Sequence, residues 1–231
     1  GIICDGQTTD TVTLGVGETK TCIITNDDVA PKLTLVKSVT KNNGGTAGVN
    51  DFGLTIGGVS VTSGEIKTLL ANTPYAINEA GLTGYTFVSI TGNAKCPTNL
   101  GGTINLAPGD DITCTITNDD NPATLIVKKH VNNDYGGTRL APSFTMNVTG
   151  TNVSNSSFPG SEEGTTITLN AVSYSVDEGS HDGYTKTLSA DCSGTITLGE
   201  TKNCTITNDD QPGHLIVTKV TDPTDTQTLF P

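Results

Sequence analysis

The chain of 231 residues contains no tryptophan, a single methionine, and only five tyrosines and five phenylalanines. Hydrophobic residues make up 33% of the sequence, which is little for one large core but suits several thin cores. Helix-favouring residues are also scarce, whereas threonine, valine, isoleucine and glycine are frequent. The composition therefore predicts a nearly all-β chain with room for two domains of ordinary size.

Basic residues are few as well, because 12 lysines and arginines stand against 24 aspartates and glutamates, for a net charge of −12. This balance argues against nucleic-acid partners, which need a basic face, and against an anionic membrane surface. No apolar run is long enough to span a bilayer, so we expect no membrane insertion. An acidic surface remains compatible with cation binding.

One string occurs three times, as "CIITNDD" from Cys22 and as "CTITNDD" from Cys114 and from Cys204. The intervals of 92 residues (114 − 22) and 90 residues (204 − 114) correspond to whole small domains rather than to solenoid repeats. Alternating apolar residues with glycine turns between the copies indicate tandem Ig-like antiparallel β-sandwich domains.

The positions of the three strings predict how the chain is divided. A complete unit opens on a strand such as "LTLVK" or "LIVKK" and closes on the cysteine-bearing string. We therefore expect the closing hairpin of a partial domain at 1–28, complete sandwich domains at 29–120 and 121–210, and the first strand of a further or strand-exchanged domain at 211–231.

Six cysteines fall into three pairs of similar spacing, which predicts disulfides and an oxidising, extracellular compartment. A hairpin-like stretch separates the members of each pair, so each disulfide is expected to staple one hairpin. Metal thiolates are the alternative, but no C-x-x-C motif occurs and the three histidines are scattered. The expected disulfides are Cys4–Cys22, Cys96–Cys114 and Cys192–Cys204.

Four N-x-S/T sequons also fit an extracellular chain. Such sequons are frequent by chance in a threonine-rich sequence, so they support this compartment less than the cysteines do. The candidate glycosylation sites are Asn147, Asn152, Asn155 and Asn203.

Three strands of each complete unit place one polar group in register with apolar residues, because residues two apart in a strand share a face. Lys37, for example, follows Leu33 and Leu35 at this spacing. The polar residues are Lys37, Glu79 and Asn118 in the first complete unit, and Lys129, Glu178 and Asn208 in the second. The partial units retain Asn26 and Lys219.

Burying such groups is normally unfavourable, but one reaction makes use of a low dielectric. A desolvated lysine loses its proton more easily, and a buried carboxyl group retains its proton. The neutral amine can then attack the side-chain carbonyl of asparagine, while the carboxyl group hydrogen-bonds that carbonyl and transfers protons. Ammonia leaves, and an amide joins lysine to asparagine. The alternative is a salt bridge between lysine and glutamate at the domain rim, with asparagine capping a turn.

Both complete units resemble the CnaB-type domains, also called SpaA-like or prealbumin-like domains, of bacterial pilins and adhesins. The resemblance rests on the inward lysine of the first strand, on "YAINEAGLTGY" and "YSVDEGSHDGY", and on the asparagine that ends the last strand. It implies spontaneous isopeptide bonds Lys37–Asn118 and Lys129–Asn208, promoted by Glu79 and Glu178. The cysteine beside each asparagine departs from the usual pattern of the family.

The "NDD" strings lie at the expected domain junctions, where carboxylates could hold Ca²⁺. Asp119, Asp120 and Asn121 would then be ligands. A polar turn that stiffens the junction before Pro122 is the other interpretation, and the sequence shows no complete set of calcium ligands at regular spacing.

Together with the resemblance, these patterns imply a non-enzymatic structural protein on the surface of a prokaryotic cell, forming a crosslinked stalk or filament without a cofactor. A ligand-binding adhesin, with or without Ca²⁺, is the alternative, and an accessory module of a secreted enzyme is a third class. The expected partners are copies of the chain, or further repeats of the same polypeptide, joined head to tail by strand complementation.

Overall fold

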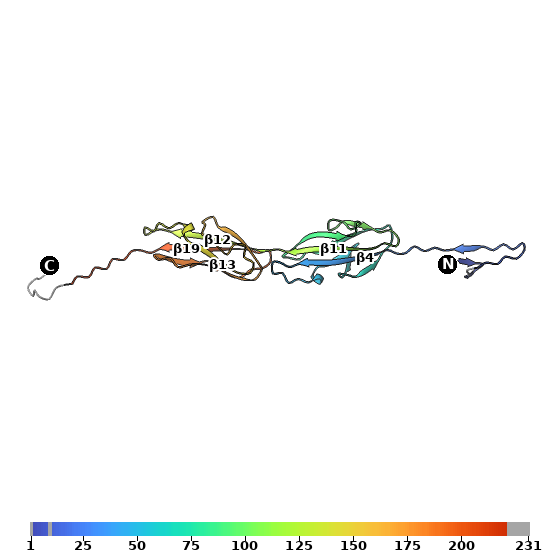
Figure 1. Ribbon diagram of the computed structural model, residues 1–231, viewed down its shortest axis with the longest axis horizontal. Helices are drawn as coiled ribbons and strands as arrows, with labels where there is room; N and C mark the ends of the chain where they lie inside the picture. The colour runs from blue at the N-terminus through green and yellow to red at the C-terminus, as the bar shows by residue number, and fades with distance from the viewer. Residues whose placement is uncertain (1, 9–10, 221–231) are drawn as a thin grey trace, which may run out of the picture. The chain divides into compact units, whose positions relative to one another are not determined.

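A computed structural model describes residues 2–8 and 11–220 of the chain (Figure 1). The chain divides between Asn121 and Pro122 into two compact units, and each unit contains a sandwich of two β-sheets. Helical structure in the described residues consists of short 3-10 turns at Val49–Asp51, Ala141–Ser143 and Ala190–Cys192. None of these turns is long and apolar enough to cross a membrane. The all-β tandem sandwich fold is confirmed.

The first sandwich is built from eight strands in two four-stranded sheets. The strands are β4 (Lys32–Thr40), β5 (Leu54–Ile56), β6 (Val59–Val61), β7 (Ile66–Thr68), β8 (Pro74–Glu79), β9 (Tyr85–Gly92), β10 (Thr103–Asn105) and β11 (Asp111–Asp120). One sheet has the order β7-β4-β11-β9, and the other has the order β10-β8-β5-β6.

The second sandwich repeats this plan. Its strands are β12 (Ala123–Asn132), β13 (Thr145–Thr149), β14 (Ser157–Pro159), β15 (Thr165–Leu169), β16 (Ser173–Glu178), β17 (Tyr184–Leu188), β18 (Ser193–Thr195) and β19 (Thr201–Asp210). One sheet has the order β15-β12-β19-β17, and the other has the order β14-β13-β16-β18. Each sandwich encloses its own apolar cluster, in agreement with the several thin cores that the composition predicts.

The first and last strands of each sandwich lie side by side and run parallel, which the expectation of purely antiparallel sheets did not include (Figure 1). Parallel neighbours need a long connection, and the intervening strands of the unit provide it. Lys37 on β4 lies opposite Ile116 on β11, and Lys129 on β12 lies opposite Ile206 on β19. The lysine-bearing and asparagine-bearing strands are therefore direct neighbours.

The N-terminal region forms a separate small sheet of β1 (Ile2–Cys4), β2 (Gln7–Thr8) and β3 (Cys22–Ile24), in the order β2-β1-β3. At the other end, residues 211–220 form no strand and their side chains are exposed. The remainder of the first strand expected at 211–231 lies outside the described residues. The division of the chain into the four segments proposed from the sequence remains a prediction.

All three disulfides are present with the expected pairing, but only one staples paired strands. Cys4 lies directly opposite Cys22 in the N-terminal sheet. Cys96, by contrast, lies in the connection after β9, and Cys192 lies in the 3-10 turn after β17. The hairpin expectation is wrong for these two bonds, because the segment between the cysteines crosses to the opposite sheet as β10 or β18 before it returns.

Candidate crosslink sites

The lysine and asparagine of each unit are brought together by the parallel strand pair. Asn118 lies two residues beyond Ile116, the residue opposite Lys37, so both side chains point into the same sandwich. Glu79 ends β8 in the opposite sheet and contacts the lysine across the core. Residues separated by up to 81 positions in the sequence thus meet in one buried site.

In the first unit, the Lys37 Nζ lies 2.9 Å from the Oδ1 of Asn118. The same nitrogen donates to the backbone oxygens of Ser38 (3.0 Å) and Ile116 (3.2 Å). It also lies 3.4 Å from the Glu79 Oε2 and 4.5 Å from the centre of the Phe52 ring. The amine is therefore held against the carboxamide that it would attack.

The site in the second unit has the same residue types, and its contacts differ at one atom. The Lys129 Nζ lies 3.5 Å from the Glu178 Oε2 and 4.5 Å from the Phe144 ring centre, and it donates to the backbone oxygen of Ile206 at 3.3 Å. The Oδ1 of Asn208, however, has no hydrogen-bond donor within the described part of the chain. The buried amide is in place, but its oxygen is unsatisfied.

Burial excludes the position at the domain rim that one of the two interpretations required. The side chains of Lys37 and Glu79 are 0% and 1% exposed, and those of Lys129 and Glu178 are both fully buried. A rim salt bridge, the alternative from the sequence, would be solvated, so the structure contradicts that alternative. The inward orientation of the three polar rows is confirmed in both sandwiches.

Desolvation also changes the acid–base behaviour of the lysines. Burial lowers the pKa of Lys37 below its ordinary value, although the neighbouring Glu79 acts to raise it. Burial likewise lowers the pKa of Lys129 against the opposing effect of Glu178, and Lys186 adds to the lowering. A lower pKa increases the fraction of neutral amine, which is the nucleophilic form.

Several buried oxygens at these sites find no hydrogen-bond donor among the residues that the structure describes. They are the Glu79 Oε2, both carboxylate oxygens of Glu178 and the Asn208 Oδ1. The Glu79 Oε2 and the Glu178 Oε2 are nevertheless ion-paired with the lysines, at 3.4 and 3.5 Å. The Glu178 Oε1 and the Asn208 Oδ1 have no such partner in the described residues, and unsatisfied buried groups of this kind call for a chemical explanation. Conversion of a charged lysine, a carboxamide and a carboxylate into a neutral amide and a neutral acid would supply one.

The corresponding residues near the chain ends are in a different environment. Asn26, which follows β3, and Lys219 are both exposed. Apolar side chains beside them are exposed too, with Ile24 at 65% and Val217 at 82%. The structure therefore does not place these two residues in a buried crosslink site.

The calcium candidates have other contacts. The two carboxylate oxygens of Asp120 accept backbone N–H groups of the turn that follows β4, at distances down to 2.6 Å for Gly45. The Oδ1 of Asn121 accepts the Thr86 hydroxyl at 2.8 Å, and the Oδ1 of Asp119 has no partner in the described ranges. No group of three metal-ligating side chains occurs in residues 2–8 and 11–220. Since Asp120 is committed to the turn, the calcium interpretation is not supported.

All four sequon asparagines are exposed, as an acceptor of a glycan must be. They all lie in the second unit. Asn147 is on β13, Asn203 is on β19, and Asn152 and Asn155 lie in the connection between β13 and β14.

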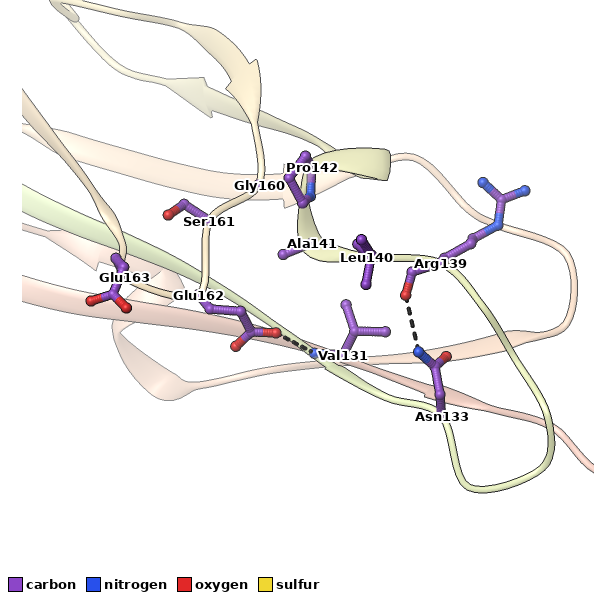
Figure 2. Close-up of a pocket in the computed structure, with 10 residues that line it drawn as sticks. All are labelled: Val131, Asn133, Arg139, Leu140, Ala141, Pro142, Gly160, Ser161, Glu162 and Glu163. Carbon is purple, nitrogen blue, oxygen red and sulfur yellow. Dashed lines mark hydrogen bonds between the residues drawn. The ribbon is translucent and has the colours of Figure 1, made fainter.

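The second unit also has an open pocket of about 350 Å³, whose lining does not include Lys129, Glu178 or Asn208 (Figure 2). Its wall includes Glu162, whose Oε1 accepts the Val131 N–H at 3.1 Å. Asn133 donates through its Nδ2 to the backbone oxygen of Arg139 at 3.0 Å, and the Arg139 guanidinium points away from the pocket (Figure 2). These contacts tie the walls to one another and identify no ligand.

A family model of SpaA type, described as a prealbumin-like fold domain, matches the chain twice, over residues 28–116 and 120–211. The two matches cover most of the chain. No curated protein gives a match.

Solved structures with a similar fold include three that are each 15% identical to this chain. The Bacillus anthracis TIE protein gives a TM-score of 0.46 over 83% of this chain and 37% of its own. A C-terminal fragment of the pilus adhesin SpaC from Lactobacillus rhamnosus GG gives 0.41 over 82% of this chain and 100% of its own. A single B repeat unit of the collagen-binding surface protein of Staphylococcus aureus gives 0.31 over 80% and 100%. The present chain thus spans little more than a third of the TIE protein chain.

Proposed function

The chain belongs to the SpaA-type family of prealbumin-like fold domains, as its sequence motifs predicted, and we propose that it is a structural protein of a prokaryotic cell surface. It acts as a pilus-like stalk or filament segment in which each complete sandwich is locked by a self-formed Lys–Asn isopeptide bond. It is not a turnover enzyme, because each site would react once and consume its own side chains.

The reaction proceeds from the arrangement in the first unit. The neutral Nζ of Lys37 attacks the Cγ of Asn118 while protonated Glu79 hydrogen-bonds the carboxamide oxygen. Glu79 then relays a proton from the attacking amine to the departing nitrogen, and the Cγ–Nδ2 bond breaks. One amine and one carboxamide become one amide and one molecule of ammonia, and the glutamic acid is regenerated. The second unit would use Lys129, Glu178 and Asn208 in the same roles.

One observation carries this proposal: a fully buried Lys37 Nζ lies 2.9 Å from the Asn118 Oδ1, with the Glu79 carboxylate 3.4 Å away. This contact joins the amine to the oxygen of the carboxamide, so the nucleophile lies beside the group whose carbon it would attack. Occurrence of the same three residue types in the same strands of the second sandwich supports a common purpose.

Intact mass tests the role of the glutamates. Each isopeptide bond removes about 17 Da as ammonia, so the reduced full chain should weigh about 34 Da less than its sequence. Glu79→Gln should restore about 17 Da by blocking the first site only, and Glu178→Gln should do so at the second site. A wild-type mass equal to the sequence mass would refute the proposed crosslinks.

We also propose that the chain associates head to tail by strand complementation, within a polymer or with further repeats of the same polypeptide. The segment "HLIVTK" from His214 repeats the pattern of β4 and β12, and its apolar Leu215 and Ile216 are 89% and 87% exposed. Exposed apolar strands tend to pair with another sheet.

Negative-stain imaging and sedimentation of the full chain at increasing concentration test the association. We expect assemblies that grow longer as the protein concentration rises. Replacing Leu215, Ile216 and Val217 by serine should abolish this growth. Monodisperse single chains at high concentration would contradict association through this segment.

A further inference from the structure

The second aspartate of the "NDD" string in each complete unit holds the turn that follows the lysine strand. In the first unit, the Oδ1 of Asp120 accepts the backbone N–H groups of Asn42 (3.0 Å) and Asn43 (2.9 Å). Its Oδ2 accepts the N–H of Gly45 at 2.6 Å, and Asn43 adds a side-chain bond to the Asp120 backbone oxygen at 2.7 Å. Asp120 itself is 2% exposed.

The second unit has the same backbone contacts to the carboxylate at equivalent positions. The Oδ1 of Asp210 accepts the N–H of Asp134 at 2.7 Å, and its Oδ2 accepts those of Tyr135 at 2.9 Å and Gly137 at 2.7 Å. The turn residues are displaced by 92 positions from those of the first unit (134 − 42), as Lys129 is from Lys37 (129 − 37). Two independent copies have thus kept one set of contacts.

A tyrosine on the neighbouring strand completes the set. Tyr85 pairs with Asp120 across β9 and β11, and its hydroxyl oxygen accepts the N–H of Ala47 at 2.9 Å. Tyr184 pairs with Asp210 in the same way, and its hydroxyl oxygen accepts the N–H of Arg139 at 3.2 Å. This accounts for the tyrosine of the "GY" that closes each glutamate-bearing segment.

Only glycine fits beneath these groups. A Cβ on Gly45 would come within 2.7 Å of the Asp120 Oδ2, and a Cβ on Gly137 would come within 2.8 Å of the Asp210 Oδ2. Real Cβ atoms do not approach so closely. The second glycine of "NNGG" and of "DYGG" is therefore needed for the turn to lie against the carboxylate.

These contacts fix how far the lysine strand can slide along the asparagine strand. Asp120 lies two residues beyond Asn118, and the turn that it holds begins directly after β4 ends at Thr40. A slip of two residues keeps every side chain on its own face, so facing alone does not prevent it. Such a slip would move Asn118 by about 6.6 Å relative to Lys37 and out of reach of the amine.

We propose that Asp120 and Asp210 are positioning residues for the crosslinks. Their contacts with the turn set the register of the first and last strands, and this register places each asparagine beside its lysine. The effect on crosslinking rests on the proposed function, whereas the contacts between the aspartates and the turn do not depend on an isopeptide bond. The carboxylates take no part in proton transfer, because both oxygens of each are occupied by backbone N–H groups.

Peptide mass mapping of the full chain at timed intervals after cell-free synthesis tests the proposal. Asp210→Asn should slow formation of the Lys129–Asn208 link by about tenfold, because weakening a charge-assisted hydrogen bond changes an equilibrium by about that factor. The Lys37–Asn118 link in the same molecules should form at its normal rate. Asp120→Asn should give the reverse pattern. Asp209→Asn, at the exposed neighbouring position, is the matched control and should change neither rate.

Amide hydrogen exchange separates a register effect from general destabilisation. Asp210→Asn should raise exchange in β12 and β19 and leave the opposite sheet of β13 and β16 unchanged, whereas general destabilisation would raise exchange in both sheets. Gly137→Ala, which retains the carboxylate but crowds it, should reproduce the slow linking.

Normal linking rates in Asp210→Asn, or equal changes of exchange in both sheets, would overturn the proposal. Failure of both Asp210→Asn and Gly137→Ala to fold would overturn it too, because these residues would then serve the fold rather than the register. If the unmodified chain formed no crosslink, the proposed function would fail, but the register role could still be tested. Amide hydrogen exchange in β12 and β19 that is the same in Asp210→Asn as in wild type would contradict the register role.

Discussion

A lysine ammonium surrounded by apolar side chains is held only when its charge is balanced or removed, and Lys37 and Lys129 have both options. Each contacts a carboxylate, a phenylalanine ring and backbone carbonyls, which stabilise the ammonium form. Burial at the same time lowers the pKa of each lysine, which favours the neutral amine. The sites are therefore poised between an ion pair and a nucleophile.

At the residue scale, alternation in the sequence was sufficient to place the three polar side chains of each site on the core face. It did not identify Phe52 and Phe144 as the rings beneath the lysines, because a single phenylalanine carries no signal of its own. It also treated the second aspartate of "NDD" as a junction residue. The recurrence of that aspartate together with a Gly-Gly turn and a Gly-Tyr pair was the signal that could have revealed the contact.

Gly160 gives a prediction about how tightly the second lysine is enclosed. A Cβ at this position would come within 2.5 Å of the Ala141 backbone oxygen and 2.7 Å of the Lys129 Cβ. Gly160→Ala should therefore destabilise the second unit by about 1–3 kcal/mol through overpacking. Urea unfolding followed at amides of β12 measures this. Gly179→Ala is the control, because a Cβ there meets no atom within 4 Å, and a similar loss in the control would contradict the packing argument.

Asp210 gives a prediction for pH. Burial alone would raise its pKa, but the N–H groups of Gly137, Tyr135 and Asp134 outweigh burial and hold the pKa below the ordinary value of 3.8. A lowered folded-state pKa contributes stability above the unfolded-state value, and this contribution is lost as pH falls through the folded-state value. The stability advantage of wild type over Asp210→Asn should therefore be constant at neutral pH and shrink below about pH 4. A difference that does not change down to pH 2 would contradict this origin.

At the scale of elements, the sequence predicted the strands and the sandwich, but not the pairing of the first strand with the last. Parallel pairing of β4 with β11 joins segments some 80 residues apart, and short-range patterns carry no information about such partners. The hairpin expectation for Cys96–Cys114 and Cys192–Cys204 failed for a related reason. Two strands separated by a turn-like stretch look like a hairpin even when the stretch contains a strand of the other sheet.

The link between these two strands should dominate the stability of the first unit. A Lys37–Asn118 bond closes a loop of 81 residues, which in the chain-entropy model corresponds to about 4.5 kcal/mol. Glu79→Gln, if it leaves the site unlinked, should lower the free energy of unfolding of the first unit by about this amount. Calorimetry of the full chain measures it, with the second unit as the internal control. Equal stability of linked and unlinked first units would contradict the argument.

At the scale of the whole molecule, both complete sandwiches have the same three constraints on their first and last strands. A disulfide holds the last strand, an aspartate holds the turn after the first strand, and the proposed amide joins the two strands directly. When such a chain is pulled from its ends, force would pass from Lys37 to Asn118 through the amide. The residues between them would carry no load.

Single-molecule stretching of the full chain under reducing conditions tests this load path. When the wild-type first unit unfolds, the segment between Lys37 and Asn118 should add nothing to the measured extension. The unlinked Glu79→Gln unit should release roughly 280 Å more, the extended length of about 80 residues. Equal extension of the two proteins would show that the amide does not carry the force.

Peptide mapping of the wild-type chain tests the central claim most directly. After reduction and proteolysis, the account predicts a branched peptide that joins the segment containing Lys37 to the segment containing Asn118, lighter by about 17 Da than the two separate peptides combined. A second branched peptide should join Lys129 to Asn208. Recovery of all four segments as separate linear peptides at their full masses would contradict the account.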